Sequence, residues 1–144
     1  AVSYITLANG YRLQGLYDEA VRSLQRAAGL APGQPVIWAE MGFTQLLAGQ
    51  PDEAVQSLET ASAHAMPAPY VVRVNFHLSR AYTRRGETEK AVRATARMMS
   101  ARDGLATWKA ALRALEGTAY GQTLRYEVAD IEQAIADADA GKLE

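Results

Sequence analysis

The sequence predicts an all-α fold in which antiparallel helix pairs stack into an α-solenoid. A seven-residue motif, G-L-Y-D-E-A-V, begins at Gly15, returns as G-Q-P-D-E-A-V at Gly49 and comes back in weaker form as G-E-T-E-K-A-V at Gly86. Gly15 and Gly49 are 34 residues apart, and Gly49 and Gly86 are 37 residues apart. A period near 34 residues indicates helix–turn–helix repeats that cover one another's apolar faces. No stretch of the chain shows the alternating pattern that is typical of a strand.

Each repeat is expected to carry one helix before its glycine and one after it. The glycine allows the left-handed backbone that ends the first helix. In the second repeat Pro51 suits the first position of the next helix, and Asp52 and Glu53 suit the positive end of its dipole. The helices expected in chain order cover residues 2–14, 18–30, 35–48, 52–64, 69–85 and 88–100. The three extra residues of the longer interval are expected to add one turn to the front of the helix that starts at Pro69.

The last part of the chain is expected to form a degenerate fourth helix pair that caps the solenoid. Its first helix is expected around Trp108. In its second helix, apolar residues recur at spacings of four, three and four: Leu124, Val128, Ile131 and Ile135. Because the last repeat has no neighbour to cover it, this helix is expected to lie on the convex side with its acidic residues pointing to solvent. The expected division is repeat 1 at 1–34, repeat 2 at 35–68, a degraded repeat 3 at 69–103, and the cap at 104–144.

The residues around the glycines also follow a wider pattern of side-chain size. Large residues, Tyr4 and Trp38, begin the first two repeats, and small residues, Ala8 and Gly42, follow four places later. Other matching positions in these repeats are Leu7 and Met41, Tyr11 and Gln45, Ala20 and Ala54, Leu24 and Leu58, and Ala27 and Ala61. This pattern resembles the tetratricopeptide repeat (TPR) family. The third repeat departs from the pattern at Asn75, Thr95 and Met98.

The resemblance implies a right-handed solenoid whose first helices line a concave groove that holds a partner peptide or helix. The groove positions of the family fall on Ile5, Asn9, Leu13, Glu40, Phe43, Leu47, Arg73, His77, Arg80 and Arg84. One TPR subclass grips an acidic chaperone tail with a clamp of basic and amide residues. At the matching positions this chain has Ile5, Asn9, Glu40, Arg73 and His77. Glu40 would repel the carboxylate of such a tail, so the clamp is not favoured.

Charge is distributed unevenly along the chain. The formal net charge is −3 over residues 1–71, +7 over residues 72–115 and −5 over residues 116–144. Four basic residues form one stripe on a predicted groove-lining helix, at spacings of four, three and four: Arg73, His77, Arg80 and Arg84. Exposed apolar residues are expected beside this stripe, at Leu13, Phe43, Leu46 and Leu47. We therefore expect a partner that is both acidic and apolar, although an ordinary solvated helix face would also explain the stripe.

The sequence predicts a binding protein and not an enzyme. Its 144 residues include no cysteine and only two histidines. Neither histidine has a metal-ligand partner on its own helix face, so we expect no catalytic residues, no cofactor and no metal. The favoured function is a non-catalytic scaffold or adaptor domain of a larger, bacterial-type protein.

Three further expectations concern assembly, other partners and location. Self-assembly through the groove or the solenoid ends is the alternative function, and the acidic last helix could reach the groove of a neighbouring molecule. Nucleic-acid binding is disfavoured because acidic segments flank the basic block and few groove aromatics could stack on bases. No apolar run approaches the ~20 residues of a membrane helix. The compartment stays open, with cytoplasm favoured over periplasm.

Overall fold

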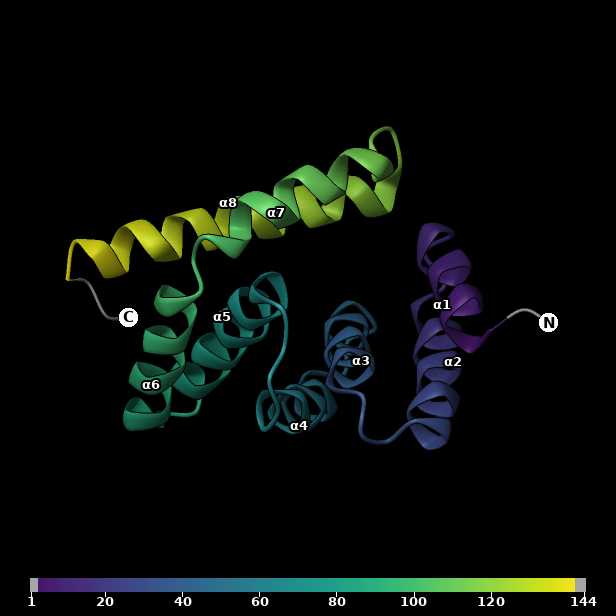
Figure 1. The fold of residues 1–144 in the computed structure, drawn as a ribbon, viewed down its shortest axis with the longest axis horizontal. Coiled ribbons are helices and arrows are strands. Elements are labelled where there is room, and N and C mark those ends of the chain that lie inside the picture. Colours follow the sequence, from purple (N-terminus) through teal and green to yellow (C-terminus); the bar gives the residue numbers. More distant parts are fainter. Residues whose placement is uncertain (1–2, 142–144) are drawn as a thin grey trace. The chain divides into compact units, whose positions relative to one another are not determined.

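The computed structural model describes residues 3–141, and these residues form helices and no strand (Figure 1). The all-α prediction is therefore confirmed. The described residues fold into two compact units: unit 1 ends at Met66 and unit 2 begins at Pro67. The four-part division into repeats and the hand of the solenoid stay predictions.

Unit 1 contains two helix pairs. Its helices are α1 (Tyr4–Leu13), α2 (Tyr17–Leu30), α3 (Pro35–Leu47) and α4 (Pro51–Ser62). Each pair turns at a glycine with positive φ, 75° at Gly15 and 76° at Gly49. Beyond Gly15, the backbone N–H of Leu16 donates to the carbonyl of Tyr11 at 2.9 Å, which closes the end of α1. Val2, where the sequence placed the start of the first helix, lies outside the described residues.

The core of unit 1 forms where small residues of one helix meet large residues of the next. Ala8 and Ala20 are fully buried, in one apolar cluster with Met41 of α3. Gly42 lies so close to α4 that a Cβ built on it would be 2.6 Å from the Cγ of Leu58. Because carbon atoms in contact prefer separations of about 3.5–4.0 Å, the missing side chain of Gly42 is what permits this approach.

Unit 2 contains one helix pair, followed by a shorter helix and a long last helix. Its elements are α5 (Ala68–Arg84), α6 (Thr88–Ser100), α7 (Gly104–Ala111), the 3₁₀ helix η1 (Leu112–Leu115) and α8 (Ala119–Asp139). The helix α5 has 17 residues, whereas α3 has 13. The turn between α5 and α6 again uses a glycine with positive φ, 73° at Gly86.

Hydrogen-bonded polar groups fill positions at which the third repeat departs from the family pattern. Asn75 is 2% exposed, and its side chain donates to the carbonyl of Val71 at 2.9 Å and accepts from Arg97 at 2.8 Å. The hydroxyl groups of Ser79 and Thr95 are 2.7 Å apart. Buried polar atoms need such partners, so these substitutions do not leave orphaned groups between α5 and α6.

The segment from residue 102 to residue 116 runs antiparallel to α8. Three ion pairs show this: Arg102 with Asp139 at 2.8 Å, Lys109 with Glu132 at 2.8 Å, and Glu116 with Arg125 at 3.7 Å. Each step of seven residues forward in the first segment is a step of seven backward in α8. All six side chains are exposed, so the pairs indicate the register and add little stability.

Candidate partner-binding faces

In unit 1, the predicted groove positions of α1 form an exposed stripe. Ile5, Asn9 and Leu13 are four residues apart, so their side chains follow one side of the helix. Ile5 is 43% exposed and Leu13 is 46% exposed. At the position of α3 that corresponds to Leu13, Leu47 is partly buried. The stripe therefore presents two aliphatic side chains with an amide between them.

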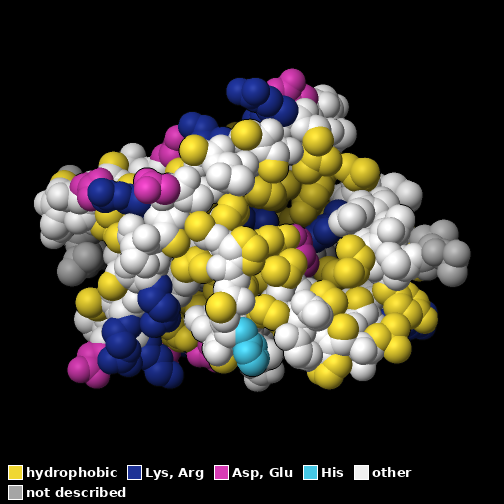
Figure 2. All heavy atoms as spheres, in the orientation of Figure 1, with side chains coloured by type: hydrophobic (Ala, Val, Ile, Leu, Met, Phe, Trp, Pro, Cys, Tyr) yellow, Lys and Arg dark blue, Asp and Glu magenta, His cyan; other side chains and the backbone are white. Residues whose placement is uncertain are grey.

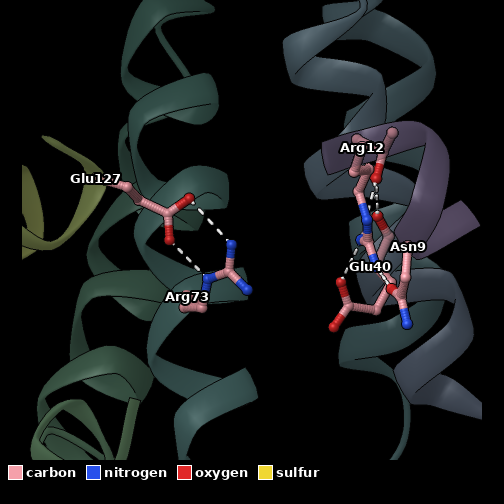
Figure 3. Close-up of polar contacts among 6 residues, drawn as sticks. Asn9, Arg12, Glu40, Arg73 and Glu127 are labelled. Atoms are coloured by element: carbon pink, nitrogen blue, oxygen red, sulfur yellow. Dashed lines mark hydrogen bonds and ion pairs between the residues drawn. The ribbon is translucent and has the colours of Figure 1, made fainter. Parts of the chain in front are cut away.

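A buried ion pair joins α1 to α3 beside this stripe (Figure 3). Nη1 of Arg12 lies 2.7 Å from Oε1 of Glu40 and also donates to the hydroxyl of Thr44 at 3.4 Å. Nη2 of the same guanidinium donates to the side chain of Asn9. The side chains of Arg12 and Glu40 are only 6% and 21% exposed. Glu40, which the sequence presented as an obstacle to an acidic ligand, is thus already paired inside unit 1.

Arg12 was not among the predicted site residues. The available signal was a basic residue and an acidic residue at groove positions of successive repeats. Opposite charges there predict an interhelical pair, because the first helices of adjacent repeats lie next to each other.

Phe43 is not an exposed groove residue, which corrects one expectation. It is 4% exposed. The helix α3 carries buried residues all round its circumference, including Ile37, Ala39, Met41 and Phe43. A helix with buried residues on every side belongs in the interior, so the apolar character of Phe43 reflects burial.

In unit 2, the basic stripe of α5 is paired with acidic residues of α8. Arg73 makes two contacts with the carboxylate of Glu127, at 2.6 Å and 3.2 Å (Figure 3). Nε2 of His77 lies 3.1 Å from the same carboxylate. One turn further along, Arg80 lies 3.6 Å from Asp130. The stripe therefore has an occupant within its own unit.

The contact between Arg73 and Glu127 is buried. Their side chains are 3% and 14% exposed. The guanidinium of Arg73 also lies 4.1 Å from the ring centroid of Trp108, so its π-face and its polar edge both have partners. Burial alone would raise the pKa of Glu127, but the charge of Arg73 and the hydrogen bonds from His77 and Arg73 outweigh burial and hold that pKa well below its usual range. Glu127 is therefore a carboxylate at neutral pH.

The acidic residues of α8 were expected to point to solvent. Asp130, Glu132 and Asp139 are exposed as expected, whereas Glu127 is not. Leu124, Val128 and Ile131 are buried, at 2%, 7% and 0% exposure. Glu127 follows Leu124 by three residues and precedes Ile131 by four, so it lies on the buried side of α8. Glu127 was expected on the outer face with the other acids, although its spacing from Leu124 and Ile131 already places it beside the apolar residues.

Most of the exposed basic side chains of unit 2 lie away from the contact between α5 and α8. Arg84, the last residue of the stripe, is exposed. On α6, Lys90, Arg93 and Arg97 are exposed, and Lys and Arg side chains gather over this helix in Figure 2. Lys109 of α7 is paired with Glu132 of α8 at 2.8 Å. Much of the positive block in the sequence is therefore either neutralised by α8 or displayed on α6.

The family model for the tetratricopeptide repeat matches residues 11–71. Over these residues the chain is similar to the tetratricopeptide repeat family. The matched segment includes the glycine turns of unit 1 and the small-to-large packing around Gly42, the features that carried the resemblance in the sequence. A search of curated proteins finds no match to this chain.

TPR domains are interaction modules that generally mediate contacts between proteins. Among the residues that the structure describes, no group of three or more histidine or acidic side chains is arranged to hold a metal ion. None of the described helices combines the length and the apolar character that crossing a bilayer requires.

Proposed function

We propose that the chain is a non-catalytic protein-binding module, the scaffold or adaptor part of a larger protein, which holds a partner peptide or helix against the first helices of its repeats. The observation that carries this proposal is the exposed stripe of Ile5, Asn9 and Leu13 on α1. Leu47 of α3 occupies the position that corresponds to Leu13 and extends the site. Two aliphatic anchors spaced two helical turns apart match the way an amphipathic helix presents its own apolar side chains.

The energetics of this stripe are those of a binding surface and not of a core. Fully burying a Leu or Ile side chain stabilises a complex by about 1.5–3 kcal/mol. Ile5 and Leu13 are 43% and 46% exposed, so covering what remains exposed would contribute about 1 kcal/mol each. The loss of both contributions would weaken binding roughly thirtyfold.

The buried pair of Arg12 and Glu40 supports a rigid site. It joins α1 to α3 through a distance of 2.7 Å between Nη1 of Arg12 and Oε1 of Glu40. The same guanidinium donates to the side-chain amide of Asn9 and holds its orientation. A site whose side chains are already held in place loses less conformational entropy when a partner binds.

The partner's acidic character was predicted from the basic stripe of α5. In unit 2 the acids that pair with this stripe come from α8, through Glu127 and Asp130. The same pairing disfavours nucleic-acid binding at this face, because these cations are already neutralised. We therefore propose an apolar anchor in unit 1 as the primary determinant of binding.

Selection from a phage-displayed library of amphipathic helical peptides tests the proposal. We expect the parent protein to enrich peptides with apolar residues at spacings of three and four. The double variant Ile5→Asp, Leu13→Asp should bind the selected peptides roughly thirtyfold more weakly. Its thermal melt should match the parent, because substitutions at exposed positions usually change stability little.

Leu30→Asp provides the matched control. Leu30 is 77% exposed at the end of α2, on the second helix of its pair. Peptides that lose affinity for the Leu30 variant but not for the double variant would show that the partner docks on the second helices. The alternative function, self-assembly, predicts a mass in sedimentation that rises with protein concentration and falls in the double variant.

A further inference from the structure

We propose that the basic face of α5 is a second docking site, for an acidic amphipathic helix of a partner protein, and that α8 occupies this site from within the same chain. This inference rests on the proposed protein-binding function and adds a site, a ligand chemistry and an internal competitor. It concerns unit 2 alone. The exposed stripe of unit 1 plays no part in it.

The fit of α8 on α5 defines the ligand that the face accepts. Glu127 supplies one carboxylate to both Arg73 and His77, and Asp130 supplies a second to Arg80. These two acids are three residues apart on a helix, so they lie on adjacent turns of one side. Leu124 and Ile131 flank them and are buried at 2% and 0% exposure. A competing helix therefore needs two acids at this spacing between apolar residues.

The ion pairs that attach α8 to the rest of unit 2 differ in burial, and therefore in strength. Arg80 and Asp130 are 48% and 62% exposed, and a pair this open contributes little. The ion pairs of α8 with Lys109 and Arg102 are similarly exposed. Among the ion pairs of α8 in the described residues, those of Glu127 with Arg73 and His77 are largely buried, and Arg73 is the more buried partner. Removing one member of a buried pair is strongly unfavourable, so the contact of Glu127 with Arg73 dominates the electrostatic part of the attachment.

The C-terminal half of α8 also packs incompletely. A pocket of about 250 Å³ lies between it and the α5–α6 pair, lined on one side by Phe76 and Met98 and on the other by Ala134 and Asp137. The side chains of α8 that line this pocket are small or polar, where large apolar ones would fill it. A partner helix with a large apolar residue at the position of Ala134 would gain contacts that α8 lacks.

Gly117 lies in the connection that would have to move. It has a positive φ of 82° between η1 and α8. The apparent association constant of an external helix equals its intrinsic association constant multiplied by the fraction of molecules in which α8 has left the face. Weakening α8 should therefore strengthen the binding of an external helix, which is the distinctive consequence of this proposal.

A fluorescein-labelled synthetic peptide of residues 119–139 is a suitable probe because it reproduces α8. Fluorescence anisotropy would measure its binding to three versions of the 144-residue chain: the parent, Glu127→Gln and Glu132→Gln. Glu132→Gln is the matched control, since it removes the same charge from α8 but breaks only the exposed pair with Lys109. We expect Glu127→Gln to bind the peptide at least tenfold more tightly than the parent, and Glu132→Gln to bind it as the parent does.

Hydrogen–deuterium exchange separates displacement from unfolding. In Glu127→Gln we expect faster exchange in α8 and unchanged protection in α5 and α6. The added peptide should slow exchange at the α5 face. If α5 and α6 lose protection together with α8, then α8 is an inseparable part of the unit and the proposal is wrong.

Other outcomes would overturn the inference in distinguishable ways. Equal binding of the peptide to parent and Glu127→Gln, or no binding to either, would exclude a displaceable α8. A concentration-dependent dimer of Glu127→Gln would identify a second copy of the chain as the occupant. Peptide binding lost through Ile5→Asp, Leu13→Asp would place the peptide on unit 1. The proposed function stands or falls on the library selection, which does not depend on Glu127.

Discussion

Replacing Gly42 with alanine should destabilise unit 1, although the same change elsewhere in a helix is stabilising. The added Cβ would lie 2.6 Å from both Cγ and Cδ2 of Leu58 and 3.3 Å from the carbonyl oxygen of Ala54. Leu58 is 1% exposed, so its side chain has no open space into which to move. Overpacking of this kind costs about 1–3 kcal/mol.

A glycine of α1 supplies the reference for the opposing effect. Exchanging glycine for alanine inside a helix stabilises it by about 1 kcal/mol. Gly10 is also helical, and a Cβ built on it meets nothing within 4 Å. Gly10→Ala should therefore raise the free energy of unfolding by about 1 kcal/mol. Gly42→Ala gains the same helix propensity but also suffers the overpacking against Leu58. Its free energy of unfolding should therefore lie about 1–3 kcal/mol below that of Gly10→Ala.

Urea unfolding followed by tryptophan fluorescence measures this difference. The chain has two tryptophans, and Trp38 belongs to α3 of unit 1. In a Trp108→Phe background, the signal of Trp38 alone reports the unfolding of unit 1. If Gly42→Ala is as stable as Gly10→Ala, then α3 and α4 are not held at this separation by a missing side chain, and the packing argument fails.

Two further predictions concern the core of unit 1 and the acid response of unit 2. Ala54 is fully buried, so Ala54→Leu should lower the free energy of unfolding by about 1–3 kcal/mol in the same assay; an unchanged urea midpoint would show that α4 is placed wrongly against α3. The folded-state pKa of Glu127 lies below its unfolded value of about 4.3, so its stabilising contribution is complete above that pH and is lost as the pH falls towards the folded value. The free energy of unfolding of the parent should therefore fall more steeply below about pH 5 than that of Glu127→Gln. Urea titrations followed by the fluorescence of Trp108, in a Trp38→Phe background, measure this. Equal pH dependence would contradict the role of Glu127, and the control Glu132→Gln should behave as the parent.

The repeat architecture was predictable because its determinants are local. The turn at Gly15 needs a residue that tolerates positive φ, and the packing at Gly42 needs a missing side chain. Both requirements recur at a fixed interval, so they are visible without any knowledge of distant contacts. The pairing of Asn75 with Arg97 was not visible, because a polar residue in place of an aromatic one does not reveal its partner on α6.

The candidate site was predictable only in part. The position of Ile5 and Leu13 on one side of α1 follows from spacing, and both are exposed. Exposure itself does not follow from spacing, and Phe43 shows this, since it occupies a groove position and is 4% exposed. The ion pair of Arg73 and Glu127 joins residues that are 54 positions apart in the sequence, so spacing along one helix could not reveal it. The charge order of the chain indicated that acidic and basic segments would attract, but not that they would meet within one unit.

The pair of Arg73 and Glu127 does more to fix the position of α8 than to stabilise the unit. Moving two charges out of water costs much of what their attraction returns, so a buried pair is a weak source of net stability. A misplaced helix would be penalised far more. Sliding α8 by one turn would bring Thr123 or Ile131 towards the guanidinium, which is 3% exposed and would then be a buried charge without its carboxylate. The pair therefore selects one register of α8, and any helix that replaces α8 on this face must present a carboxylate at the same place between apolar neighbours.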